Sequence, residues 1–178
     1  DGGSVYLRLA TRQITQPQRE ITDALHEDIC RGGYWLKPPA PGSELAIVYT
    51  GAIAPEATEA HESLLEDVPG AGLLAITSPD RLHDDWMGAR RQREQGNPAR
   101  AHIEKLLSDL DPRAALVTVL DGHPATLSWI GSVGRQRVAP LGVESYGQSG
   151  DIPDLYKAAG IDVDAIIDAA ASACLARL

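Results

Sequence analysis

Five short runs of apolar and β-branched residues, separated by segments with apolar residues at helical spacing, constrain the fold of this chain most strongly. The runs lie at residues 5–12, 45–50, 73–78, 115–120 and 137–143. Strands that alternate with helices pair in parallel, because each helix returns the chain to the edge of the sheet where the previous strand began. The sequence therefore predicts an α/β domain of three layers, with a five-stranded, mostly parallel sheet between helices on both faces.

The character of each run predicts its place in the sheet. The runs at 45–50, 73–78 and 115–120 are almost continuously apolar, as is typical of strands covered on both faces. The run at 5–12 alternates between apolar and other residues, which predicts an edge strand. The stretch at 32–44 is rich in Gly and Pro, and we expect an extended loop there, held in place by Tyr34 and Trp35.

Prolines mark the expected starts of several helices, because the first helical position tolerates a residue without an N–H group. Ser78 and Asn97 directly precede two of these prolines and are predicted to be N-caps. Acidic residues begin the last helix, where the helix dipole favours negative charge. The residues in these roles are Pro55, Pro79, Pro98, Pro124, Asp162 and Asp164.

Size, charge and cysteine content limit the class of protein. At 178 residues the chain is predicted to form a single domain over 1–178, and its start at Asp1 rather than Met leads us to expect a fragment of a longer polypeptide. The net charge of -9 argues against nucleic acid as a partner, and no run reaches the roughly 20 apolar residues of a membrane span. Cys30 and Cys174 are interpreted as buried, reduced thiols of a cytoplasmic protein.

The sequence predicts no catalytic residue, cofactor site or metal site. There is no Gly-x-Ser-x-Gly turn for a nucleophile, and the glycine-rich stretch at 70–75 precedes a strand, whereas a phosphate-binding loop follows one. The histidines do not cluster, although His26 and Cys30 are spaced to share one helix face, so structural roles are expected for them. These histidines are His26, His61, His83, His102 and His123.

Three features keep more than one interpretation. The turn at 147–150 follows a predicted strand, so its backbone amides could hold an anion, although a purely structural turn is the commoner case. His123 precedes a helix and could cap that helix or face a partner. Arg90, Arg91 and Arg93 could bind a carboxylate or phosphate beside Trp86, but ion pairs within the chain are the more usual explanation.

Four stretches resemble a known family. The segment at 141–170 is similar to the end of transketolase-family proteins, in which a strand leads through an aromatic-Gly-x-Ser turn and a short helix to a Gly-Ile before the last helix. The segments at 5–12, 32–57 and 121–133 resemble homodimeric pyruvate dehydrogenase decarboxylating components. The residues that carry the first match are Tyr146, Gly147, Ser149, Leu155, Gly160 and Ile161.

The resemblance implies the C-terminal domain of the transketolase and homodimeric pyruvate dehydrogenase family, a five-stranded mixed sheet that supports a homodimer. Thiamine diphosphate and Mg²⁺ would be bound by the preceding domains of the parent enzyme, and the family's Gly-Asp-Gly signature is not found in this sequence. Partners would be those preceding domains, a second subunit and a lipoyl acyltransferase. The residues expected at an interface or ligand site are Trp35, His123, Trp129, Tyr146, Gly147 and Ser149.

Three functions remain open at this point. The first is assembly of a thiamine-dependent 2-oxoacid dehydrogenase of the pyruvate type. The second is the same role in a transketolase, which transfers two-carbon ketol units. The third, from a different class, is a free-standing regulatory module that binds a small ligand at the carboxyl ends of its parallel strands.

Overall fold

The computed structural model describes residues 3–4, 10, 12–145 and 147–176. Its sheet has five strands in the order β1-β3-β2-β4-β5, in which β1 is antiparallel to β3 and the other neighbours are parallel. The predicted α/β class and mixed, mostly parallel sheet are therefore confirmed. The strands are β1 (Gly33–Lys37), β2 (Ser43–Thr50), β3 (Gly72–Ile76), β4 (Leu110–Leu120) and β5 (Arg137–Leu141).

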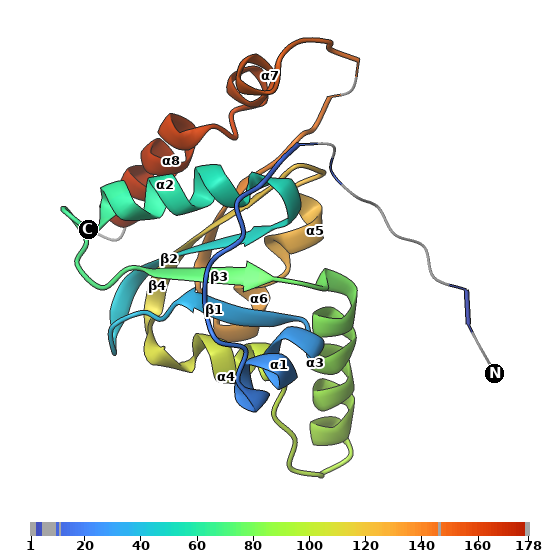
Figure 1. Cartoon of the computed structure of the whole chain (residues 1–178). Coiled ribbons are helices and arrows are strands. Elements are labelled where there is room, and N and C mark those ends of the chain that lie inside the picture. The colour runs from blue at the N-terminus through green and yellow to red at the C-terminus, as the bar shows by residue number, and fades with distance from the viewer. Residues whose placement is uncertain (1–2, 5–9, 11, 146, 177–178) are drawn as a thin grey trace.

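Helices cover both faces of the sheet, with α2 and α8 side by side on one face and α3 and α4 on the other (Figure 1). Short 3₁₀ turns lie at Gly51–Ile53 and Leu107–Asp109. The helices are α1 (Asp23–Cys30), α2 (Ala54–Leu64), α3 (Pro79–Glu94), α4 (His102–Leu106), α5 (Ala125–Ser128), α6 (Gly131–Gly134), α7 (Ile152–Ala159) and α8 (Val163–Leu175).

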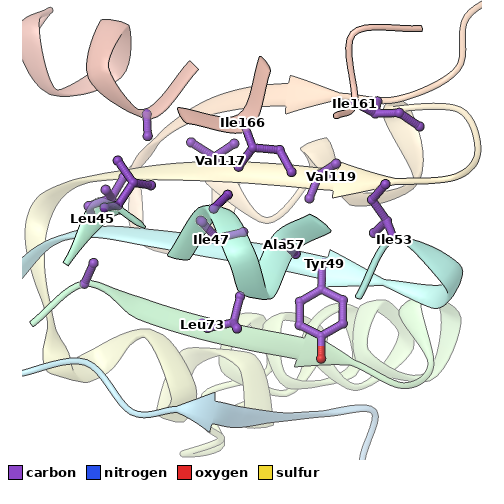
Figure 2. Close-up of a cluster of buried hydrophobic side chains, with 14 of the residues drawn as sticks. Leu45, Ile47, Tyr49, Ile53, Ala57, Leu73, Val117, Val119, Ile161 and Ile166 are labelled. Atoms are coloured by element: carbon purple, nitrogen blue, oxygen red, sulfur yellow. The ribbon is translucent and has the colours of Figure 1, made fainter. Parts of the chain in front are cut away.

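Strand β2 shows how alternation builds two cores from one sheet. Its residues Leu45, Ile47 and Tyr49 face α2 and α8, whereas Ala46 and Val48 face α3 and α4. Figure 2 shows the first of these cores, where Leu45, Ile47 and Tyr49 lie beside side chains of β3, β4 and the helices above. Both sets are buried, so β2 is a central strand, as its continuous apolar character predicts.

The prediction of a loop at 32–44 is wrong over Gly33–Lys37, because these residues form the edge strand β1. Tyr34 pairs with Ala75 of β3, and the indole Nε1 of Trp35 donates to the carbonyl oxygen of Leu106 at 3.0 Å. The edge strand predicted at 5–12 falls largely outside the described residues. The described residues form a five-stranded sheet in which β1 is a strand that the sequence did not predict.

Two helix starts test the capping predictions. Ser78 is confirmed as the N-cap of α3, because its hydroxyl accepts from the amide of Arg81. The start predicted at Asn97 and Pro98 is wrong, since α4 begins at His102. Two carboxylates set that start, because Glu104 Oε2 accepts from the Ala101 amide at 2.8 Å and Asp85 Oδ2, on α3, accepts from the His102 amide at 2.6 Å.

The cysteines and histidines have ordinary environments. Cys30 is exposed at the end of α1, which contradicts its predicted burial, and its Sγ lies 3.8 Å from Nε2 of His26 one turn earlier. Helix α1 has no buried residue, so its last turn offers no core for the thiol. His61 and His102 are buried, and their Nε2 atoms bond backbone carbonyls, which confirms structural roles for these two.

Arg90 and Arg93 of α3 have partners within the chain. Arg93 forms a two-pronged ion pair with Glu104, at 2.8 and 3.0 Å, and the guanidinium of Arg90 lies over the ring of Trp86, with its central carbon 5.1 Å from the ring centroid. Intrachain pairing, the more usual of the two interpretations, is therefore confirmed for Arg93.

Candidate functional site: a crevice at the carboxyl ends of the parallel strands

The order of the strands creates a crevice between the ends of β2 and β4. After β2 the chain turns into α2 on one face of the sheet, and after β4 it turns into α5 on the opposite face. Two neighbouring parallel strands whose continuations diverge in this way leave a gap at their carboxyl ends, where open α/β sheets bind ligands. The topology alone therefore positions a site.

A cavity of about 990 Å³ occupies this position. Its floor comes from the ends of the strands, at Thr50–Ala52 and Leu120–His123, and one wall comes from α7 and the turn that precedes it. A volume of this size is at the upper end of the range for small-molecule sites. Its lining residues are Ala10, Arg12, Thr50, Gly51, Ala52, Leu120, Asp121, Gly122, His123, Thr126, Val143, Ser145, Gly147, Gln148, Ser149, Ile152, Leu155, Tyr156, Ala158 and Ala159.

Close backbone contact fixes the floor. The amide of Val143 donates to the carbonyl oxygen of Gly122 at 2.8 Å, which ties the segment after β5 to the loop after β4. A β-carbon on Gly142 would lie 2.5 Å from that same oxygen and 2.8 Å from Pro124. Position 142 therefore requires glycine for this approach.

Arg12 links three parts of the chain at the edge of the cavity. Its Nη1 lies 2.7 Å from Oε1 of Glu56 on α2, and its guanidinium carbon lies 5.8 Å from the ring centroid of Tyr156 on α7. The contact with Glu56 is an ion pair without good hydrogen-bond alignment, because Nη1 and the second carboxylate oxygen, Oε2, are buried without a hydrogen-bond partner. The N-terminal segment is thus joined to both helices that flank the crevice.

Burial and charge shift the pKa values of two of these groups. Burial raises the pKa of Tyr156, the nearby carboxylates of Asp121 and Glu56 raise it further, and Arg12 lowers it without cancelling the others. Burial opposes the charge of Arg12, but Glu56 and Tyr156 outweigh it, so the pKa of Arg12 is raised. The phenol stays protonated and the guanidinium stays charged under ordinary conditions.

His123 faces the crevice and also caps a helix. Its Nδ1 accepts from the amide of Ala125 at 3.2 Å, at the start of α5. A neutral imidazole that accepts at Nδ1 carries its proton on Nε2, so the ring offers a hydrogen-bond donor from that atom. Asp121, two residues earlier, is exposed and offers a carboxylate acceptor.

The residues predicted as interface or ligand contacts separate into three groups. His123, Gly147 and Ser149 line the cavity together. Trp35 packs in the fold at β1, and Trp129 stacks on Trp86 with ring centroids 5.4 Å apart, so both lie away from the crevice. The sixth predicted residue, Tyr146, lies outside the described residues.

Sequence reasoning missed Arg12, Glu56, Asp121 and Tyr156. Asp121 carried a usable signal, since it directly follows the apolar run at 115–120 and so had to lie at a strand end. The other three come from distant segments that only the tertiary fold brings together. Within the residues that the structure describes, no group of three His, Cys, Asp or Glu side chains is placed to hold a metal ion, and no helix is long and apolar enough to cross a bilayer.

Comparison with known proteins supports the fold through structure rather than sequence. No family model and no curated protein matches the sequence. Transketolase from Leishmania mexicana matches 82% of this chain with a TM-score of 0.55 and 19% identity, and that from Campylobacter jejuni subsp. jejuni NCTC 11168 matches 79% with 0.55 and 17%. A split-gene transketolase, described as an "inactive beta4 tetramer" of subunits, matches 79% of this chain with a TM-score of 0.54 and 19% identity.

This chain spans only part of each of these relatives. It covers 18% of the Leishmania mexicana chain and of the Campylobacter jejuni chain, and 41% of the split-gene chain. The match extends over most of the present chain. The chain therefore has the fold of a transketolase C-terminal-like domain.

Proposed function

We propose that this chain is a non-catalytic assembly domain of a thiamine diphosphate-dependent enzyme of the pyruvate dehydrogenase type, acting in the cytoplasm. The observation that carries the proposal is the match of most of this chain to a small part of two longer transketolase chains. In such an enzyme the thiamine diphosphate and Mg²⁺ would be held by other domains, where oxidative decarboxylation of a 2-oxoacid would occur. The segments that resemble pyruvate dehydrogenases favour the 2-oxoacid branch.

A transketolase is the second candidate, because every solved structure named above is a transketolase. Assays of the complete natural polypeptide that contains this chain separate the two. We expect 2-oxoacid decarboxylation with transfer of the acyl group to a lipoyl acceptor. Ketol transfer between sugar phosphates, without decarboxylation, would replace the first candidate by the second. A reading frame that begins directly before Asp1 would contradict both.

The assembly role requires an exposed apolar surface. Leu175 at the end of α8 is 68% exposed and Leu65 beyond the end of α2 is 38% exposed, and these two helices pack together. Exposed leucines on adjacent elements are typical of subunit contacts. The split-gene relative, of which this chain covers 41%, is a tetramer by its description.

The test of assembly is the oligomeric state of the complete polypeptide in sedimentation experiments. We expect Leu175→Glu to shift the dimer toward monomer, because it places a charge in an apolar contact. Ile21→Glu is the matched control, since Ile21 is 56% exposed and lies before α1. An unchanged dimer in the Leu175 variant would remove this surface from the proposal, and a monomeric parent protein would refute the assembly role.

A further inference from the structure

We propose that the crevice between β2 and β4 binds an uncharged ring compound that carries neighbouring hydroxyl groups, as a nucleoside does. The crevice lies at the divergence of α2 and α5, where an open α/β sheet places its ligands, and its volume of about 990 Å³ accommodates a molecule of that size. The chemistry of three parts of its lining defines the ligand.

Asp121 and His123 supply the polar contacts. The Asp121 carboxylate is exposed, and it forms no hydrogen bond or ion pair with any residue in the described part of the chain. A carboxylate can accept hydrogen bonds from two hydroxyl groups on adjacent carbons. His123, held by Ala125, presents its Nε2–H as a donor to a ligand oxygen. The pair matches a diol that donates to one side chain and accepts from the other.

The charge of the crevice excludes an anion. Arg12 is the cation of the lining, and its charge is already balanced by Glu56 at 2.7 Å. Asp121 then leaves an acidic excess, and Asp151 and Asp154 at the start of α7 already occupy the positive end of that helix. A phosphate would meet uncompensated carboxylates, in a chain whose net charge is -9. The turn at 147–150 is accordingly no phosphate site in this proposal.

The wall formed by α7 supplies the apolar contact. Ile152, Leu155 and Ala159 line the cavity and are only half-buried, and Val143 lies beyond them on the segment after β5. A flat ring placed against this wall would remove their remaining apolar surface from water, which favours binding. The ligand therefore needs both a ring and an uncharged hydroxylated edge.

The experiment is calorimetric titration of the chain with adenosine as the probe. We expect binding that weakens by about tenfold or more in Asp121→Asn, because the amide replaces a charged acceptor that both hydroxyl groups of the ligand would use. Asp154→Asn is the matched control, since Asp154 is an exposed aspartate of α7 that does not line the cavity, and it should bind as the parent does. Circular dichroism confirms that both variants are folded.

Three further probes test each part of the argument. 2′,3′-Dideoxyadenosine should bind at least tenfold more weakly than adenosine, which tests the diol. Adenosine monophosphate should also bind more weakly, which tests the charge, and ribose alone should bind most weakly, which tests the apolar wall. Absence of adenosine binding, equal binding by the Asp121 variant, or tighter binding of the monophosphate would each overturn the proposal. None of these results affects the assembly role, which depends on a different surface.

Discussion

Trp35 packs directly against Gly72 across the edge of the sheet, so closely that a β-carbon at position 72 would lie 2.6 Å from Cζ3 of the indole ring. The contact joins β1 to β3 through a side chain while their backbones pair side by side. It explains how a segment that begins with two glycines and is followed by two prolines becomes a strand, because the indole ring and its hydrogen bond to Leu106 fix the segment against the body of the domain.

Replacement of Gly72 should therefore destabilise the domain. We expect Gly72→Ala to lower the free energy of unfolding by roughly 1 to 3 kcal/mol, the usual cost of forcing extra volume into a packed site. Gly88→Ala is the matched control, because Gly88 lies inside α3 and a β-carbon there would meet no atom within 4 Å. That alanine should stabilise the helix by up to about 1 kcal/mol. Urea denaturation measures the free energy of unfolding of both variants. Equal changes in the two variants would contradict the close contact between Trp35 and Gly72.

Tyr49 should make the fold sensitive to strongly alkaline pH. Burial raises the pKa of Tyr49 to about 12, with a smaller contribution from Tyr34. Between its ordinary value near 10 and about 12 the unfolded state loses the proton first, so stability should fall as the pH rises, by at most about 1.4 kcal/mol per pH unit. Below about pH 10 the phenol of Tyr49 should not make the free energy of unfolding depend on pH.

The measurement is denaturant unfolding from pH 9 to pH 12, with Tyr49→Phe as the control. The variant has no ionisable phenol at this position, so its free energy of unfolding should decline less steeply over the same pH interval. Tyr156 is retained in both proteins, and its raised pKa contributes the same direction of change to each. If the free energy of unfolding fell with pH at the same rate in both proteins, Tyr49 would ionise equally in the folded and unfolded states.

Thiol reactivity should distinguish the two cysteines. Cys30 is exposed on α1, whereas Cys174 is half-buried against the core beneath α8. A disulfide reagent should therefore modify Cys30 rapidly in the native protein and Cys174 more slowly. Cys30→Ser should remove the fast phase and leave the slow one, and a fast phase that persists in this variant would contradict the assignment.

The ion pair between Arg12 and Glu56 should stabilise the attachment of the N-terminal segment. A double-mutant cycle with Arg12→Met and Glu56→Gln should give a coupling energy of about 1 kcal/mol, since the side chains are partly rather than fully exposed. Hydrogen exchange should also become faster for amides near residue 12 in the Arg12 variant. A coupling energy near zero would show that the ion pair does not hold this segment, and would leave the contact of Arg12 with Tyr156.

The sequence predicts the parts of the fold that depend on local pattern. Strand β2 is predicted as a central strand because its residues from Leu45 to Tyr49 are all apolar. The start of α3 is predicted correctly because Ser78 and Pro79 mark it. Strand β1 was missed because its pairing with β3 and the support from Leu106 come from residues distant in the sequence. The start of α4 was misplaced for the same reason, since Asp85 on another helix helps to fix it.

The residues of the candidate site likewise separate into those that local sequence predicts and those that depend on distant contacts. His123, Gly147 and Ser149 could be named in advance because they follow predicted strands. Arg12 could not, because nothing in its neighbours indicates that it reaches Glu56 and Tyr156. Residues that depend on a single turn of chain are predictable, whereas pairs formed across the fold are not.

The divergence of α2 and α5 has a consequence for how such domains change over evolution. The gap between β2 and β4 is a product of connectivity, so it would persist through any substitution that leaves the strand order intact. Residues of the loops that border it, such as Asp121 and Ser149, are exposed and can vary without disturbing either core. Domains of this shape thus inherit a binding position at little energetic cost, and different lineages are free to adapt it to different ligands or to leave it unused.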